Sequence, residues 1–317
     1  MTRSRFQYLE IGRRLRRRTV VVEEPIATPA ERTFFRLVET IGSFGTDLSE
    51  LTSPGGLAVD SDGNLYIADT LNNRIQKITP QGDVYGLGGD NLLLHPCDVA
   101  VDNARFIYVV EQGANRIQKF GPKGQFIFAV GGPEARWPRF ASPTAIFLDS
   151  YHHVYVADSD NNRVTSYTAT GRWLTDYHGP RPDLSFARPQ GVAVDAGGFI
   201  YVADTMHHRI LRLTPDGKFD SQIGRPGPET GELSEPRGLA IDPDGGLWVA
   251  DSGNDRVQKF APDGQVTTCF PGGRDVDLSC PNAVAVDSRG SVYVSDSLNH
   301  RIVRLAPAGE QLEDQTG

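Results

Sequence analysis

A stretch that occurs six times constrains this chain more than any other feature. It runs first from Pro54 to Arg74, as PGGLAVDSDGNLYIADTLNNR, and the later copies start at Pro96, Pro143, Pro189, Pro236 and Pro281. Counted from the proline as position 0, every copy has Asp at +6, an aromatic residue at +12, Arg at +20 and Gly at +28. The intervals of 42 to 47 residues are typical of propeller blades with four strands each.

The pattern inside each copy predicts the strands. A run of small and β-branched residues such as Val192 to Val194 ends at the +6 Asp and suits the innermost strand, where space is limited. A second strand ends at the acidic residue at +15, a third begins at the +20 Arg, and a fourth follows the +28 Gly. The last copy lacks its fourth strand, whereas residues 34–42 resemble an outer strand without a blade.

We therefore predict an all-β, six-bladed β-propeller of four-stranded antiparallel blades. The ring is closed by the N-terminal strand, which completes the last blade, because closure pairs strand edges that would otherwise be exposed. The predicted segments are a mobile basic arm at residues 1–32, the propeller at 33–309 and a C-terminal tail at 310–317.

Charge is unevenly distributed. Residues 1–18 hold seven Arg and one Glu, which contribute +6 to a net charge of −8, so the rest of the chain carries −14. An acidic body argues against broad nucleic-acid binding, while the arm could contact a polyanion through Arg13 to Arg18.

Cysteine content and hydropathy give an expected location. The three cysteines are an odd number without C-x-x-C spacing, which favours a reducing compartment over a disulfide framework. No apolar run approaches the ~20 residues that span a bilayer. We expect a soluble cytoplasmic protein with no membrane span.

The repeat unit P-x-G-[VL]-A-V-D-…-[YW]-V-A-D-x-x-N-x-R-[IV] resembles the NHL repeat over residues 34–309. The resemblance implies a six-bladed propeller and leaves its role open. Similar proteins include RNA- or protein-binding ends of larger regulators, sensor domains of bacterial membrane kinases, and a zinc-dependent lyase acting on peptidylglycine ends.

The charged residues that repeat are predicted to be structural. A reactive site needs one arrangement, whereas the +15 acid and the +20 Arg occur six times. We expect each carboxylate to accept loop N–H bonds and each Arg to brace its blade.

Function should lie where the copies differ, around the mouth of the central channel. The second copy alone has Asp98 at +2 and Glu111 at +15, and the fifth, opposite in a ring of six, has Arg237 at +1. An acidic pole facing a basic one would suit a zwitterionic or peptide ligand. Gln190 and Asn282 share the +1 ring and complete the candidate binding residues of the mouth.

A second candidate cluster lies in the loop before the third copy. Arg136, Trp137 and Arg139 combine guanidinium groups with an aromatic ring, which could stack bases or grip phosphate. Acidic residues in the same set of loops favour a protein partner over RNA.

The sequence does not predict a metal, a cofactor or a catalytic residue. In the NHL-type lyase, zinc-binding histidines lie at the start of inner strands, and the +1 ring here has no His. His207, His208 and His300 stand where other copies have Asn or Asp, so they are interpreted as turn residues.

These observations favour a non-catalytic binding or scaffolding propeller that captures a protein or peptide-like ligand on the channel-mouth face. The first alternative is a metal-dependent propeller enzyme, lactonase- or lyase-like, with a metal near Asp98, Glu111 and Asn282. The second alternative is an RNA-binding NHL propeller.

Overall fold

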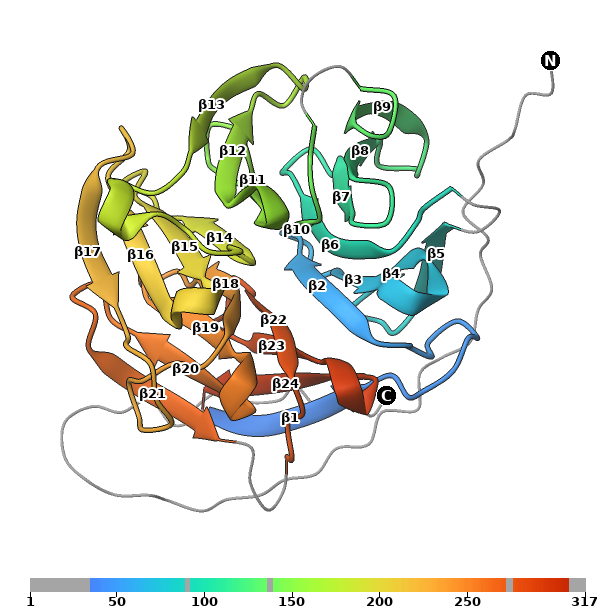
Figure 1. Cartoon of the computed structure of the whole chain (residues 1–317). Coiled ribbons are helices and arrows are strands. Elements are labelled where there is room, and N and C mark those ends of the chain that lie inside the picture. Colours follow the sequence, from blue (N-terminus) through green and yellow to red (C-terminus); the bar gives the residue numbers. More distant parts are fainter. Residues whose placement is uncertain (1–34, 89–91, 136–138, 272–275, 308–317) are drawn as a thin grey trace.

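The fold is a ring of six four-stranded antiparallel sheets around a central axis (Figure 1). The computed structural model describes residues 35–88, 92–135, 139–271 and 276–307. The predicted arm at 1–32, with Arg13 to Arg18, lies outside the described residues, as does the tail at 310–317.

Each blade runs from an inner strand at the axis to an outer strand at the rim. The inner strands are β2 (Pro54–Val59), β6 (Pro96–Val101), β10 (Pro143–Leu148), β14 (Gly191–Val194), β18 (Pro236–Ile241) and β22 (Pro281–Val286). The second strands are β3 (Leu65–Asp69), β7 (Ile107–Glu111), β11 (Val154–Asp158), β15 (Ile200–Asp204), β19 (Leu247–Asp251) and β23 (Val292–Asp296). The third strands are β4 (Arg74–Ile78), β8 (Arg116–Phe120), β12 (Arg163–Tyr167), β16 (Arg209–Leu213), β20 (Arg256–Phe260) and β24 (Arg301–Pro307).

The outer strands close the ring as predicted. Five follow their own third strands: β5 (Val84–Gly88), β9 (Phe126–Gly131), β13 (Trp173–Tyr177), β17 (Phe219–Ile223) and β21 (Val266–Pro271). The sixth is the N-terminal strand β1 (Phe35–Ile41), which pairs antiparallel with β24 and completes the last blade. The predicted fold class is confirmed.

Short 3₁₀ turns connect second and third strands in five blades. These turns are η1 (Thr70–Asn72), η2 (Ser159–Asn161), η4 (Thr205–His207), η5 (Ser252–Asn254) and η6 (Ser297–Asn299), and a further turn, η3 (Pro182–Leu184), precedes β14. The residue after each of the five adopts the left-handed conformation, which Asn, Asp and His tolerate best. The histidines His208 and His300 occupy this position, so their interpretation as turn residues is confirmed.

The repeated acid and Arg brace each blade internally. In the fifth blade, Asp251 is fully buried and accepts hydrogen bonds from Arg256 Nε at 2.7 Å and from the Ser234 backbone N–H at 2.7 Å. Asn254 and Gln258 donate to the same carboxylate at 2.9 and 3.1 Å. The other blades repeat the ion pair at 2.6–2.8 Å: Asp69–Arg74, Glu111–Arg116, Asp158–Arg163, Asp204–Arg209 and Asp296–Arg301. The prediction that these pairs are structural is confirmed.

A second set of hydrogen bonds joins neighbouring blades. The left-handed residue at +19 accepts the N–H of the residue just before the next inner strand, as Asn73 does from His95 at 2.8 Å. At the junction where the ring closes, His300 Nδ1 accepts from the Ser53 N–H at 2.9 Å. Ser297 Oγ donates to the Pro54 carbonyl at the same junction. The joint between the last and first blades therefore uses the same contacts as the others.

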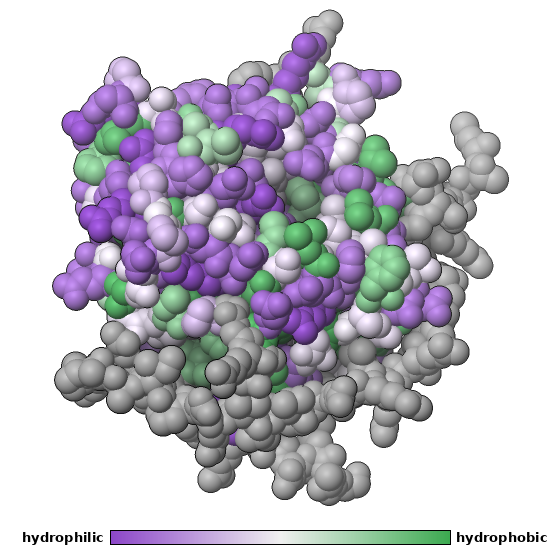
Figure 2. Space-filling model, turned by 60° about the horizontal axis from the view of Figure 1, so that its bottom comes forward, coloured by the Kyte–Doolittle hydropathy of each residue, from purple (hydrophilic) through white to green (hydrophobic). Residues whose placement is uncertain are grey.

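The hydrophobic core consists of six clusters, each between two adjacent blades. Between the fourth and fifth blades, for example, Tyr201 and Ile210 pack with Leu239 and Val249. Figure 2 shows a surface dominated by hydrophilic residues, on which apolar residues form small separate groups. The described part of the chain contains no helix with the length and apolarity needed to cross a membrane.

Candidate functional site

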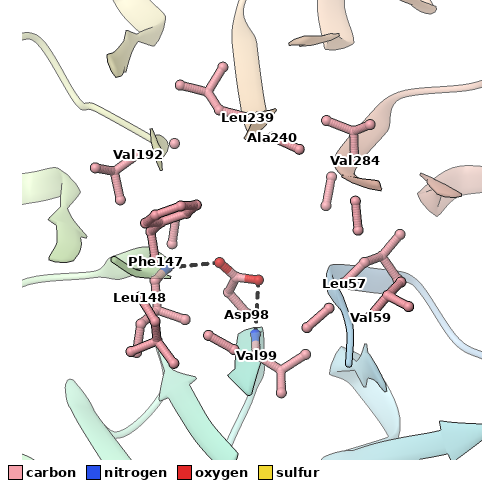
Figure 3. Close-up of a pocket in the computed structure, with 18 of the residues that line it drawn as sticks. Leu57, Val59, Asp98, Val99, Phe147, Leu148, Val192, Leu239, Ala240 and Val284 are labelled. Atoms are coloured by element: carbon pink, nitrogen blue, oxygen red, sulfur yellow. Dashed lines mark hydrogen bonds between the residues drawn. The ribbon is translucent and has the colours of Figure 1, made fainter. Parts of the chain in front are cut away.

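A cavity of about 200 Å³ occupies the propeller axis. Its walls come from the inner strands of all six blades, and Figure 3 shows their side chains converging on it. The strands approach closely because five of the six copies have Gly or Ala at +2. A Cβ atom on Gly191 would overlap the Arg237 carbonyl oxygen of the next blade, and one on Gly238 would crowd Ala283. The channel is consequently narrow.

Asp98 carries the only polar side chain among the described residues that line this cavity. Its Oδ1 accepts the N–H of Val99 at 2.8 Å, and its Oδ2 accepts the N–H of Ile146 in the next blade at 2.8 Å (Figure 3). On the other side, a Cβ atom on Gly56 would overlap Oδ1, so a glycine is required there. The carboxylate thus lies at the axis in contact with three blades.

The apolar surroundings change the acidity of Asp98. Burial among aliphatic walls raises its pKa from an ordinary 3.8 to about 7, because the charged form loses hydration. The two backbone N–H bonds act in the opposite direction, since they stabilise the anion. Each carboxylate oxygen still has a free lone pair, so the group can accept or release a proton near neutral pH.

The other residues predicted for the mouth lie at its rim. Arg237 donates to Asn282 Oδ1 at 3.1 Å and lies 3.7 Å from Glu235. Gln190 is half-buried and bonds Ala203 through its backbone N–H. Arg237, Asn282 and Gln190 do not line the cavity that contains Asp98, so the two predicted poles do not face each other within it.

The structure places the Glu111 side chain inside its own blade and not in the axial cavity. Its side chain is fully buried and bonds Arg116 Nε at 2.6 Å, the amide of Gln118 and the N–H of Leu94. These partners match those of the Asp in the other blades. A longer acid simply serves the same bracing function.

Cys97 also serves the joint between blades. Its Sγ lies 3.2 Å from the Pro143 carbonyl oxygen. In four other joints the equivalent proline carbonyl accepts a hydrogen bond from a Ser or Thr hydroxyl. Burial strongly raises the pKa of this thiol, so the thiolate form is disfavoured.

The donors proposed for a metal do not fit one. Glu111 is held in its ion pair, Asn282 Oδ1 accepts from Arg237, and only Asp98 lines the cavity. In the part of the chain that the structure describes, no three His, Cys, Asp or Glu side chains are grouped to hold an ion.

The loop cluster is only partly visible. Arg136 and Trp137 lie outside the described residues, and Arg139 is exposed and contacts Asn161 and Arg163 through its carbonyl oxygen. The predictions of RNA or protein binding through this loop remain predictions.

Phe147 is a channel residue that sequence reasoning missed. Position +4 is Ala in the five other copies, and in the third it is Phe147, whose ring lies beside Asp98 (Figure 3). The signal was available, because Phe147 departs from the repeat as plainly as Asp98 does. The two unusual residues are linked through Ile146. Its backbone N–H donates to Asp98, and Phe147 is the next residue in the chain.

Comparison with known proteins supports the repeat assignment. The family model described as the NHL repeat matches residues 51–78, 186–213, 233–260 and 278–305. The second and third copies, which hold Asp98 and Phe147, are not among the matched segments. A search of curated proteins found no significant match.

Several solved structures share the fold. A gluconolactonase from Xanthomonas campestris has a TM-score of 0.71 at 17% identity, covering 94% of this chain and 99% of that one. A streptogramin B lyase has a TM-score of 0.63 at 18% identity, covering 84% and 98%. A virginiamycin B lyase from Staphylococcus aureus has a TM-score of 0.61 at 15% identity, covering 86% and 99%. At these identities the likeness is one of fold.

These comparisons contradict the prediction of a non-catalytic binding or scaffolding propeller. The three propellers above are named as enzymes, one a lactonase and two lyases.

Proposed function

We propose that this six-bladed propeller, four of whose repeats match the NHL repeat, is an enzyme that opens a lactone ring, with Asp98 as its general base. The observation that carries the proposal is a single carboxyl group in an apolar channel, with its pKa raised to about 7. A base with a pKa near the working pH combines a useful ionised fraction with adequate basicity. The likeness to a gluconolactonase supports the class of reaction.

The proposed reaction uses water and one carboxylate. Ionised Asp98 takes a proton from a water molecule while the water oxygen bonds to the carbonyl carbon of the lactone. The ring C–O bond then breaks, and the leaving oxygen takes the proton back from Asp98. The product is a hydroxy acid that contains one more water than the substrate. Asp98 ends the cycle ionised, as it began.

The reaction can be tested by turnover and product mass. Purified protein is assayed at pH 6 to 9 against alkyl δ-lactones, glucono-δ-lactone and open-chain aryl esters, and products are identified by mass spectrometry. We expect lactone opening with a mass gain of one water, and kcat/KM that rises with pH and levels off above about 7. Products without the mass gain would assign the reaction to elimination, as in a lyase. No turnover of any lactone across this range would contradict the proposal.

A further inference from the structure

The six inner strands turn backbone N–H and C=O groups toward the axis. Each inner strand is the edge of its sheet and is hydrogen-bonded on one side only. In an antiparallel pair, residues whose N–H bonds the partner strand alternate with residues whose N–H points away from it. Since every described lining residue except Asp98 is apolar, the other polar groups that border the cavity belong to the backbone.

The register of the strands shows which N–H groups face the cavity. In the third blade the N–H of Ile146, at +3, donates to Asp98 on the axial side of the strand (Figure 3). Ile146 lies opposite Val156, which is at +13. The same two positions are opposite each other in the other five blades: Leu57–Ile67, Val99–Val109, Val192–Val202, Leu239–Val249 and Val284–Val294. The +3 N–H therefore points to the axis in every blade.

Two of these six donors are occupied and four are not. Asp98 accepts the N–H groups of Val99 and Ile146, both at 2.8 Å. In the part of the chain that the structure describes, no side chain or loop carbonyl accepts the other four, whose residues all line the cavity: Leu57, Val192, Leu239 and Val284. We call these four N–H groups the free donor layer, because equivalent positions of a ring lie at one level along its axis. A buried N–H without an acceptor is unfavourable, so a ligand that supplies one is stabilised.

A carboxylate is the acceptor that suits the free donor layer. N–H groups that converge at a sheet edge form a concave site for an anion, and their bonds to a charged oxygen are stronger than those to a neutral one. Asp98 shows that a carboxylate can bridge two +3 N–H groups of adjacent blades. The cavity volume is about 200 Å³. Roughly 150 Å³ holds one benzene molecule, so a molecule of about six non-hydrogen atoms fits.

A second carboxyl group beside Asp98 requires that the two share a proton. Two ionised groups at the axis would repel each other, whereas a protonated Asp98 can donate its O–H to the ligand. Burial raises the pKa of Asp98 to about 7, so this proton is available near neutral pH. The neighbouring strands β2 and β10 carry no titratable residue. Burial strongly raises the pKa of the Cys97 thiol, which stays neutral, and Glu111 is held by Arg116.

We propose that the propeller axis binds a small monocarboxylate, which accepts hydrogen bonds from the free donor layer and from the O–H of Asp98. The inference concerns binding, so it does not depend on lactone opening. If the proposed function also holds, the hydroxy acid that it releases occupies the same site and inhibits the reaction.

Calorimetry with propionate tests the site and its proton. Propionamide, which has the same shape and no charge, is the matched ligand. We expect propionate to bind at least about tenfold more tightly than propionamide at pH 6. Its Kd should rise about tenfold per pH unit above about 7, with uptake of one proton. In Asp98→Asn, which is neutral at every pH, the Kd should not change between pH 6 and 9.

The free donor layer can be tested by removing one donor. Leu239→Pro deletes an N–H that faces the axis, and proline is tolerated at such edge positions. We expect its Kd for propionate to rise about tenfold, the typical effect of one hydrogen bond to a charged group. Leu239→Ala keeps the N–H and is the matched control, with a change below about threefold.

Backbone NMR gives a readout on the unaltered protein, should Leu239→Pro fail to fold. With ¹⁵N-labelled leucine and valine, saturating propionate should move the four amide proton resonances of the free donor layer downfield. Leu211, in the third strand β16 away from the axis, should not respond. Absence of these shifts, equal binding of propionate and propionamide, or a Kd independent of pH would overturn the inference. Propionate binding without lactone opening would support it and remove the proposed function, whereas lactone opening without propionate binding would do the reverse.

Discussion

Replacing Asp98 by alanine is expected to lower kcat/KM for lactone opening by about 100-fold or more at pH 8. Removing a general base typically costs two to four orders of magnitude in rate. Among the described lining residues, no other side chain can take a proton in its place. The fold should tolerate the change, because Ala145 and Ala283 occupy the same position in other blades. Initial rates on an alkyl δ-lactone measure the effect.

Measuring the free energy of unfolding distinguishes the loss of the base in Asp98→Ala from a folding defect. The pKa of Asp98 is raised in the folded state, so its contribution to stability is present below about pH 4 and is lost as pH rises toward 7. The stability advantage of wild type over Asp98→Ala should therefore shrink over this range, by about 4 kcal/mol for a pKa raised from 3.8 to about 7. Asp244→Ala, an exposed change in the fifth blade, should alter neither rate nor stability. Undiminished turnover in folded Asp98→Ala would show that another group is the base.

Replacing Asp251 by alanine is expected to reduce the free energy of unfolding by about 3 kcal/mol or more. Breaking a buried ion pair by removing one partner leaves the other charge buried without compensation, which typically costs about 3–5 kcal/mol. Here Arg256 would keep three carbonyl partners. The Ser234 N–H would lose its acceptor, and Asn254 and Gln258 would each lose one of their two acceptors. Urea denaturation followed by tryptophan fluorescence measures the change.

Two variants calibrate that experiment. Asp251→Asn keeps the shape and one acceptor oxygen, and it should cost less than the alanine change. Asp244→Ala removes an exposed carboxyl from the same blade and should stay within about 0.5 kcal/mol of wild type. A loss below about 1 kcal/mol for Asp251→Ala would mean that the repeated acid does not hold its blade together.

The architecture could be predicted from the sequence because repetition constrains it strongly. Six copies in register predicted the blades, and the unpaired strand before Pro54 predicted how the ring closes. The bracing role of the acid and Arg followed from their recurrence. Each of these inferences depends only on comparing copies, which needs no knowledge of where a side chain points.

The site could be predicted only in part, because a departure from the repeat has two possible meanings. Asp98 and Glu111 both depart from the pattern in the same blade. In the structure Asp98 lies at the axis and Glu111 binds the partners of the Asp that it replaces. The sequence does not distinguish a side chain that enters the channel from one that enters its own blade. Phe147 was overlooked because charged departures were sought and apolar ones were not.

The reaction class could not be predicted from the residues either. From the sequence, Asp98 was a candidate binding residue and, in the enzyme alternative, lay near a metal. A lone carboxyl in an apolar channel acquires a pKa near 7 from desolvation, and desolvation depends on the closed ring of six inner strands.

Titration of Asp98 itself tests most directly whether this carboxyl can serve as the base. With ¹³C-labelled aspartate, the carboxyl resonance of Asp98 is the one absent from the spectrum of Asp98→Ala, and its shift can be followed from pH 3 to 9. We expect a midpoint near 7, well above the ordinary 3.8. A midpoint below about 5 would contradict it, because Asp98 would then be an ordinary surface-like acid, and the channel would not supply the base on which the proposed function depends.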